Sequence, residues 1–181
     1  IHNKVTECFD SGQDMEVFWS KKNTDIILKK NKIRSKYCNS KHTLHTAETA
    51  FEKIALSQVN LHEPSLRILK KANPENSPKT LISIAERQKI HKTNDSFAFC
   101  GSSILGLCGL RECRDLDVVG RHNGIDAGEN HNKNLKDYGI QAYSDIFEPK
   151  NYIYYFGMKF LDVRFIKNFK VLRGEHKDLL D

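Results

Sequence analysis

Two aspartates separated by one residue, Asp115 and Asp117, are the side chains whose spacing most clearly permits chemistry. Along an extended strand, residues i and i+2 lie on one face, so we expect the two carboxylates to converge. Paired carboxylate oxygens suit Mg²⁺ or Mn²⁺, which keep other coordination positions for water and substrate phosphates. Upstream, Gly101-Ser102 ends an apolar segment, and backbone amides at such a turn can approach a phosphate closely. The pattern predicts a metal-assisted phosphate site.

The elements that position these residues are predicted from the apolar pattern. Three short apolar segments predict strands at residues 97–100, 116–119 and 160–161. Segments with helical periodicity or a capping residue predict helices at residues 46–55, 64–69, 80–91, 104–110, 132–138 and 163–170. Because strand and helix alternate in the C-terminal half, we expect an α/β (α+β) fold with a small mixed sheet and flanking helices at residues 94–181. Residues 1–93 are expected to form a basic N-terminal part, mostly helical or α/β.

The Gly-Ser turn, the apolar helix after it and the Asp-Leu-Asp strand together resemble the signature of the polymerase-beta-like nucleotidyltransferase superfamily. The match is closest to the abortive-infection toxin type, whose pattern is Gly-Gly-Thr-Ala-Leu, an apolar helix, an arginine and Asp-hydrophobic-Asp. The residues that fall where this pattern would place them are Ser102, Leu105, Arg111, Asp115 and Asp117. The resemblance implies a nucleotidyltransferase-like domain that binds Mg²⁺ (or Mn²⁺) through the aspartate pair.

A second match to the same type lies at the C-terminus, where a helical lysine is followed by an arginine, a Lys-Asp pair and a further aspartate. The matching residues are Lys170, Arg173, Lys177, Asp178 and Asp181. The resemblance implies that Lys170 and Arg173 reach the triphosphate and that Lys177-Asp178 begins a helix that holds the site together. The nucleotide-binding residues expected from both matches are Gly101, Ser102, Arg111, Lys170, Arg173 and Lys177.

Active members of the superfamily usually add a third carboxylate, which serves as general base or shared metal ligand. Two candidates exist here: Asp126, which follows the Asp-Leu-Asp segment by a hairpin-length gap, and Asp162, which is equally suited to cap a helix. We favour Asp126 as the third catalytic residue beside the aspartate pair. Two histidines, His122 and His131, could contact phosphate or assist proton transfer; the alternative is that both are surface-loop histidines.

The resemblance implies Mg²⁺-dependent transfer of a nucleotidyl or sugar-phosphate group from a nucleoside triphosphate or nucleotide-sugar to a hydroxyl acceptor. The chain would then be a nucleotidyltransferase-type enzyme. If neither candidate supplies a third carboxylate, the alternative is a non-catalytic module that binds nucleotide or a carrier within a larger glycan-synthesis enzyme. The sequence leaves the acceptor open.

Positive charge is concentrated in the N-terminal part. The net charge is +6, and residues 1–93 carry 17 Lys and Arg against 10 Asp and Glu, whereas residues 94–181 carry 12 against 13. Most of the excess lies between Lys21 and Lys41, where eight basic residues accompany one acid, Asp25. This Lys21–Lys41 cluster could contact RNA or a phosphorylated glycan carrier. An ordinary solvated helix face is the alternative.

Composition narrows the class of protein. Hydrophobic residues make up 39% and charged residues 29%, as in soluble globular domains. No apolar run approaches the roughly 20 residues of a transmembrane helix. The five cysteines follow no disulfide or zinc-ligand spacing, so a reduced, cytoplasmic location is predicted. The chain starts at Ile1-His2 without a signal-peptide pattern, which indicates part of a longer protein.

Overall fold

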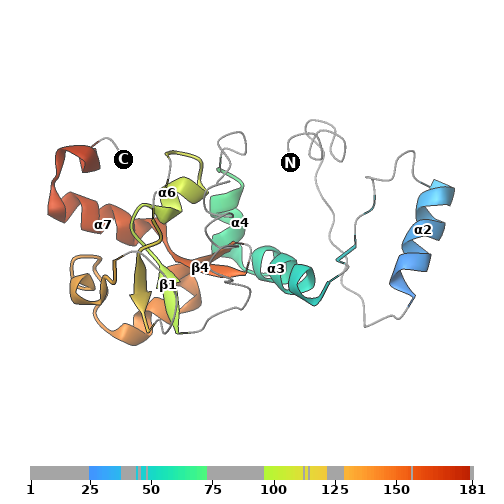
Figure 1. The fold of residues 1–181 in the computed structure, drawn as a ribbon, viewed down its shortest axis with the longest axis horizontal. Coiled ribbons are helices and arrows are strands. Elements are labelled where there is room, and N and C mark those ends of the chain that lie inside the picture. Colours follow the sequence, from blue (N-terminus) through green and yellow to red (C-terminus); the bar gives the residue numbers. More distant parts are fainter. Residues whose placement is uncertain are drawn as a thin grey trace. The chain divides into compact units, whose positions relative to one another are not determined.

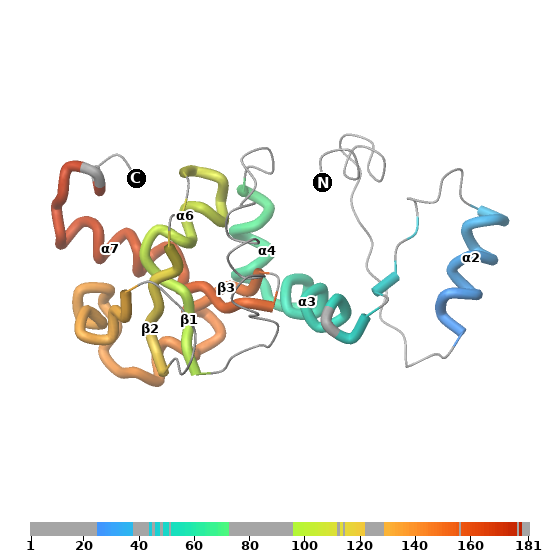
Figure 2. Tube along the Cα trace, viewed as in Figure 1, coloured from blue at the N-terminus to red at the C-terminus, as the bar shows by residue number. Residues whose placement is uncertain are grey.

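The computed structural model describes residues 25–37, 44, 46–47, 49–72, 96–111, 113, 115–121, 129–155 and 157–179. The chain divides into two compact units, Ile1–Lys53 and Ile54–Asp181 (Figures 1 and 2). In the first unit, the described secondary structure is helix α2 (Ile26–Tyr37) and the start of α3 (Ala50–Asn60). The second unit contains the sheet and the described residues of the predicted site.

The second unit is built on a four-stranded mixed sheet. Its strands are β1 (Phe97–Phe99), β2 (Val118–Gly120), β3 (Tyr152–Tyr155) and β4 (Met158–Leu161), in the order β2-β1-β4-β3. Strand β1 runs parallel to β4 and antiparallel to β2, and β3 and β4 form an antiparallel pair. Every residue of β1, β2 and β4 is buried, so these strands form the centre of the hydrophobic core. The predicted α+β class with a small mixed sheet is confirmed.

Helices flank this sheet (Figure 1). The described α-helices that lie wholly in this unit are α4 (Glu63–Leu69), α6 (Ser103–Leu107) and α7 (Val163–Arg173). Short 3-10 helices are η2 (Asn132–Asn134), η3 (Tyr143–Phe147), η4 (Pro149–Asn151) and η5 (His176–Leu179). Helix α7 begins at Asp162, whose carboxylate accepts the Arg164 amide hydrogen at 2.9 Å, and ends at Gly174, which has a φ of 62°. These two caps define the segment that carries Lys170 and Arg173.

Helix α4 docks on the edge strand β3 through polar contacts. The Tyr154 amide donates to Ser65 Oγ at 2.7 Å, and the His62 ring bonds both Ser65 Oγ and the Pro149 carbonyl at 2.7 Å. The same ring stacks on Tyr152. Residues 54–72 therefore belong to the compact unit that holds the sheet. The boundary predicted at residues 93–94 lies outside the described residues.

Several predicted elements differ from the structure in their extent. Strand β2 starts at Val118, so the two aspartates precede the strand instead of opening it. The helix predicted at residues 104–110 stops early, at the Gly109 turn, and the one predicted at 132–138 is only the single turn η2. The helix predicted at 80–91 lies outside the described residues. Within the described part of the chain, no helix is long and apolar enough to cross a membrane.

Candidate functional site

A cleft of about 560 Å³ opens where the end of β1, the segment before β2 and helix α7 meet. Ligand-binding clefts commonly have volumes of about 300–1,000 Å³. The residues that line it are Gly101, Ser102, Arg111, Asp115, Asp117, His131, Ile166, Phe169, Lys170 and Arg173. Seven of these ten were predicted as site residues from two stretches of sequence about fifty residues apart. The fold brings both stretches to one cavity.

The pairing of β1 with β2 determines how close Asp117 lies to Gly101. The Cys100 amide donates to the Asp117 carbonyl at 2.8 Å, which continues the antiparallel pairing beyond the two strands. Gly101 has a φ of 62°, and a Cβ atom placed there would overlap Asp117 Oδ2. Glycine is therefore favoured at this position both for its backbone conformation and for the space that the carboxylate occupies.

The two aspartates line the same cleft because the residue between them faces the core. Leu116 is 1% exposed, while Asp115 is exposed and Asp117 is partly buried. This alternation persists although the segment lies just outside β2. We call Asp115 and Asp117 the acidic wall of the cleft.

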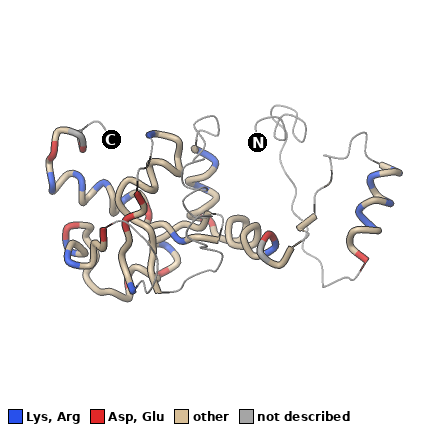
Figure 3. The backbone as a smooth tube through the Cα atoms, viewed as in Figure 1, with Lys and Arg blue, Asp and Glu red and all other residues tan. Residues whose placement is uncertain are grey.

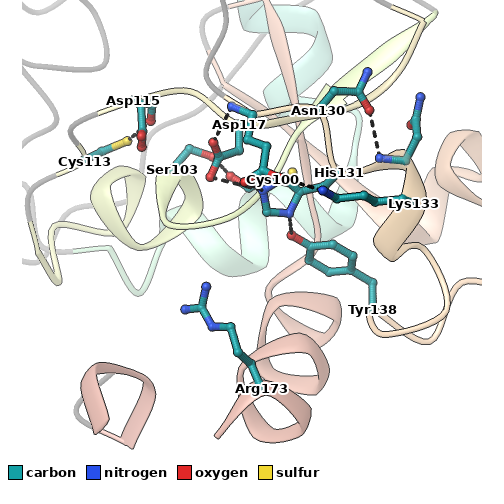
Figure 4. A network of polar contacts seen from close by, with 12 residues as sticks. Cys100, Ser103, Cys113, Asp115, Asp117, Asn130, His131, Lys133, Tyr138 and Arg173 are labelled. Atoms are coloured by element: carbon teal, nitrogen blue, oxygen red, sulfur yellow. Dashed lines mark hydrogen bonds and ion pairs between the residues drawn. The ribbon is translucent and has the colours of Figure 1, made fainter. Parts of the chain in front are cut away.

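Asp117 is held by neighbours on both of its oxygens. Oδ1 accepts the Glu129 amide hydrogen at 2.9 Å, and Oδ2 lies 3.7 Å from His131 Nε2 (Figure 4). Burial raises the pKa of Asp117 above its ordinary value, and the Asp115 and Glu129 carboxylates act in the same direction. The Glu129 hydrogen bond and His131 oppose this rise but do not cancel it. The acidic wall therefore carries negative charge that its protein neighbours only partly compensate.

His131 is fixed in orientation by a buried tyrosine. Its Nδ1 forms a 2.7 Å hydrogen bond with the Tyr138 hydroxyl, and Tyr138 stacks on Phe169 of α7. Figure 4 shows Asp117, His131 and Tyr138 joined in one chain of polar contacts. The side chain of His131 is 9% exposed, so the surface-loop interpretation of this histidine is wrong. His122 lies outside the described residues.

Glu129 is a neighbour of the acidic wall that the sequence did not reveal. The segment that contains it pairs with β2 through a parallel bridge between Val118 and Asn130. Its carboxylate lies 3.8 Å from His131 Nε2, the same nitrogen that faces Asp117. The sequence offered one weak signal, the alternation of Glu129 and His131, which places both on one side of an extended segment.

The opposite charge in the cleft comes from α7. Lys170 and Arg173 both bond the buried carboxylate of Asp178: Lys170 Nζ to Oδ1 at 3.0 Å and Arg173 Nε to Oδ2 at 2.7 Å, with a further Arg173 Nη2 contact to Oδ1. The Arg173 guanidinium also lies over the Phe169 ring, 5.2 Å from its centroid. We call Lys170 and Arg173 the basic wall. Arg173 and Lys170 together lower the pKa of Asp178 well below its usual range, by hydrogen bonding and by charge.

Of the two candidates for a third carboxylate, Asp162 lies within the described residues and does not line the cleft. Asp162 is fully buried as the N-cap of α7 and pairs with Arg164 at 2.9 Å and Arg67 at 3.8 Å, so its helix-cap interpretation is confirmed. Asp126 and Asp181 lie outside the described residues, as does the side chain of Lys177. Among the described lining residues, the carboxylates are those of the acidic wall.

A cation in this cleft would need ligands beyond the described residues. Among the described residues, no three His, Cys, Asp or Glu side chains are grouped so that they could hold a metal ion. The acidic wall offers two hard carboxylate groups, and Mg²⁺ often takes its remaining ligands from water and substrate phosphates.

Comparison with known proteins gave no match: no protein-family model, curated protein or solved structure is significantly similar to this chain. The case for a function therefore depends on the cleft.

Proposed function

We propose that this cleft binds a nucleoside triphosphate or nucleotide-sugar together with Mg²⁺ (or Mn²⁺), and that the chain transfers a nucleotidyl or sugar-phosphate group to a hydroxyl acceptor. The observation that carries the proposal is the meeting of an acidic wall and a basic wall in one cavity of suitable size. A purely basic site would suit a free anion, and a purely acidic one a free cation. Opposed walls suit a phosphate chain with a bound divalent ion.

The donor chemistry of the acidic wall fits a hard divalent cation. Asp115 and Asp117 would hold the ion, and such an ion supplies neutralisation of phosphate charge and activation of the attacking hydroxyl when bound. Asp117 Oδ2 faces the space that Gly101 leaves open, so a phosphate oxygen can come close to this oxygen without meeting a side chain of residue 101.

The basic wall and the turn after β1 would hold the phosphates. Lys170 and Arg173 project their charge into the cleft while Asp178 fixes their orientation from behind. Bidentate contacts from a guanidinium suit phosphate oxygens, and an ammonium adds a point charge. Arg111, which is exposed at the edge of the cleft, adds a third cation. The backbone of Gly101-Ser102 would complete the phosphate contacts.

A thermal-shift screen tests binding. The four common nucleoside triphosphates and a set of nucleotide-sugars are each tested with and without Mg²⁺ on the full chain. We expect at least one nucleotide to raise Tm in a metal-dependent manner, because a ligand that binds only the folded state stabilises it. Metal-independent shifts, or none with any nucleotide, would contradict the proposal.

A non-catalytic module that binds nucleotide or a carrier within a larger enzyme is the second candidate. The observation in its favour is that Asp162, one of the two residues expected to complete the catalytic set, is engaged as a helix cap. Incubation with Mg²⁺, candidate RNA, protein or sugar acceptors and either α-³²P-labelled triphosphate or a nucleotide-sugar labelled in the phosphate attached to its sugar separates the two. Label in an acceptor supports transfer, whereas binding without label supports the module.

A further inference from the structure

Helix α2 presents three exposed lysines in a row. Lys29, Lys32 and Lys36 follow an i, i+3, i+7 spacing and all three are exposed. With 3.6 residues per turn, they lie within an arc of about 60°. The helix contains no acidic residue, and Figure 3 shows its basic positions following one another along it. We call these three residues the lysine stripe.

The other two basic residues of α2, Lys30 and Arg34, are not exposed to solvent in the same way. Lys30 is buried, and Arg34 donates from Nε to the Leu44 carbonyl at 2.9 Å. Positions 30 and 34 share a helix face that lies apart from the lysine stripe. Part of the Lys21–Lys41 charge excess is therefore used within the first unit, and among its described residues the lysine stripe is the part directed to solvent.

The arrangement of apolar side chains on α2 disfavours a membrane surface as the partner. A helix that lies in a membrane interface needs one continuous apolar face. Here Ile27, Ile33 and Tyr37 are exposed and lie within an arc of about 120° around the helix. Lys30 and Arg34 fall inside the same arc, so the apolar side is interrupted by two basic residues. A stripe of cations without a continuous apolar face suits a phosphate backbone.

The length of the lysine stripe fits the spacing of phosphates along a nucleic-acid backbone. From Lys29 to Lys36 the helix rises about 10.5 Å, at about 1.5 Å per residue. Successive phosphates of one duplex strand are spaced by about 3.4 Å along the axis, so the stripe spans about three phosphate steps. The Lys36 ammonium lies 4.9 Å from the centroid of the Tyr37 ring, a cation–π contact at the C-terminal end of the stripe.

We propose that α2 binds the phosphate backbone of nucleic acid through Lys29, Lys32 and Lys36, without reading its sequence. Such contacts release condensed counterions and give affinity that falls with salt. The proposal concerns the first unit alone and does not depend on what the cleft of the second unit binds or transfers.

The test is a salt titration of binding by fluorescence anisotropy, with the full chain and short labelled duplexes of DNA and RNA of one sequence. The variant K29Q/K32Q/K36Q removes three charges and keeps helix propensity. We expect the slope of log affinity against log salt to become shallower by about 2–3 units, at about 0.9 per phosphate contact for DNA. The two duplexes show whether the backbone bound is DNA, RNA or both.

The matched control is K71Q/K136Q/K167Q, which removes three exposed lysines of the second unit and the same net charge. This control should keep the parent slope, and K29R/K32R/K36R should also keep it because the charges remain. If the triple Gln variant loses helical circular dichroism, single substitutions replace it, each expected to reduce the slope by about one unit. Equal losses in the stripe and control variants would overturn the proposal. So would a parent chain that binds anionic phosphatidylserine vesicles but neither duplex.

Discussion

Asp117 is part of the acidic wall of the cleft and Asp178 bonds both residues of the basic wall, and the pKa values of these two aspartates shift in opposite directions. The pKa of Asp117 is raised, chiefly by burial, and its Oδ2 lies 3.7 Å from His131 Nε2. The pKa of Asp178 is lowered, because an arginine and a lysine both bond its carboxylate. The basic wall is thus completed within the chain by its own counter-ion. The acidic wall is left with charge that a cation arriving with a ligand can neutralise.

This difference predicts that removing the charge of Asp178 has the largest effect on folding. In Asp178→Asn, Lys170 and Arg173 lose their shared partner, and breaking a buried ion pair costs about 3 kcal/mol or more. We expect the free energy of unfolding to fall by about 3 kcal/mol, the lower end of the range for buried pairs, because the Arg173 side chain is 31% exposed. Urea denaturation at neutral pH measures the loss. Asp137→Asn, at an exposed position of the same unit, should change stability by less than about 0.5 kcal/mol.

The same variant has a predictable pH dependence. A carboxyl whose folded-state pKa is lowered stabilises the fold above its ordinary pKa, and this contribution is lost as pH falls through the lowered value. The stability difference between the parent and Asp178→Asn should therefore be full at neutral pH and shrink as pH falls below about 4. A difference that stays constant down to pH 2 would show that Asp178 does not titrate as the paired carboxylate of the basic wall.

Gly101→Ala is expected to have the next largest effect on the stability of the fold. A left-handed conformation costs a non-glycine residue about 1–2 kcal/mol, and the added Cβ would also overlap Asp117 Oδ2. Gly174→Ala is a matched control, since Gly174 has the same φ of 62° but a Cβ atom there would lie 4.0 Å from the Val171 carbonyl oxygen, an ordinary contact distance. We expect Gly101→Ala to lose more stability than Gly174→Ala, and to lose metal-dependent nucleotide binding as well. Equal effects would mean that Asp117 moves aside freely.

Some of this site could be predicted from the sequence because local rules determine it. Alternation around Leu116 indicated that Asp115 and Asp117 share a side. Lys170 and Arg173 were predicted only from the resemblance of the C-terminal segment to a nucleotidyltransferase pattern. Strand β3 was missed because Tyr152–Tyr155 shows no alternation of apolar and polar residues. The contacts of Tyr138 with Phe169, and of His62 with Pro149, join residues far apart in sequence, so no local pattern predicts them.

Asp117→Asn tests the uncompensated charge of the acidic wall. An acid with a raised folded-state pKa binds more protons folded than unfolded, so its ionisation disfavours folding as pH rises through that window. The amide removes this penalty and can still accept the Glu129 amide hydrogen. We expect Tm at neutral pH to be unchanged or raised, while metal-dependent nucleotide binding is abolished. Calorimetric titration with Mg²⁺ and the nucleotide found in the thermal-shift screen measures this loss of binding. If the variant binds as tightly as the parent, Asp115 and Asp117 have a structural role and do not hold the metal.

Glu129→Gln should have the smallest effect and determines whether the acidic wall has two members or three. Glu129 is 61% exposed and pairs with Lys133 at 3.3 Å, and an exposed pair contributes about 0–1 kcal/mol. Its charge is the weakest of the causes that raise the pKa of Asp117, so the variant should lower that pKa only slightly, as an NMR titration of the Asp117 carboxyl would measure.

Glu148→Gln is a matched control, because Glu148 also pairs with a lysine, Lys150, and does not line the cleft. If the wall consists of Asp115 and Asp117, both glutamine variants should bind Mg²⁺ and nucleotide with a Kd within about fivefold of the parent, since a loss confined to an exposed pair is below about 1 kcal/mol. A loss in Glu129→Gln as complete as that expected for Asp117→Asn, with Glu148→Gln unaffected, would instead make Glu129 the third carboxylate of the site.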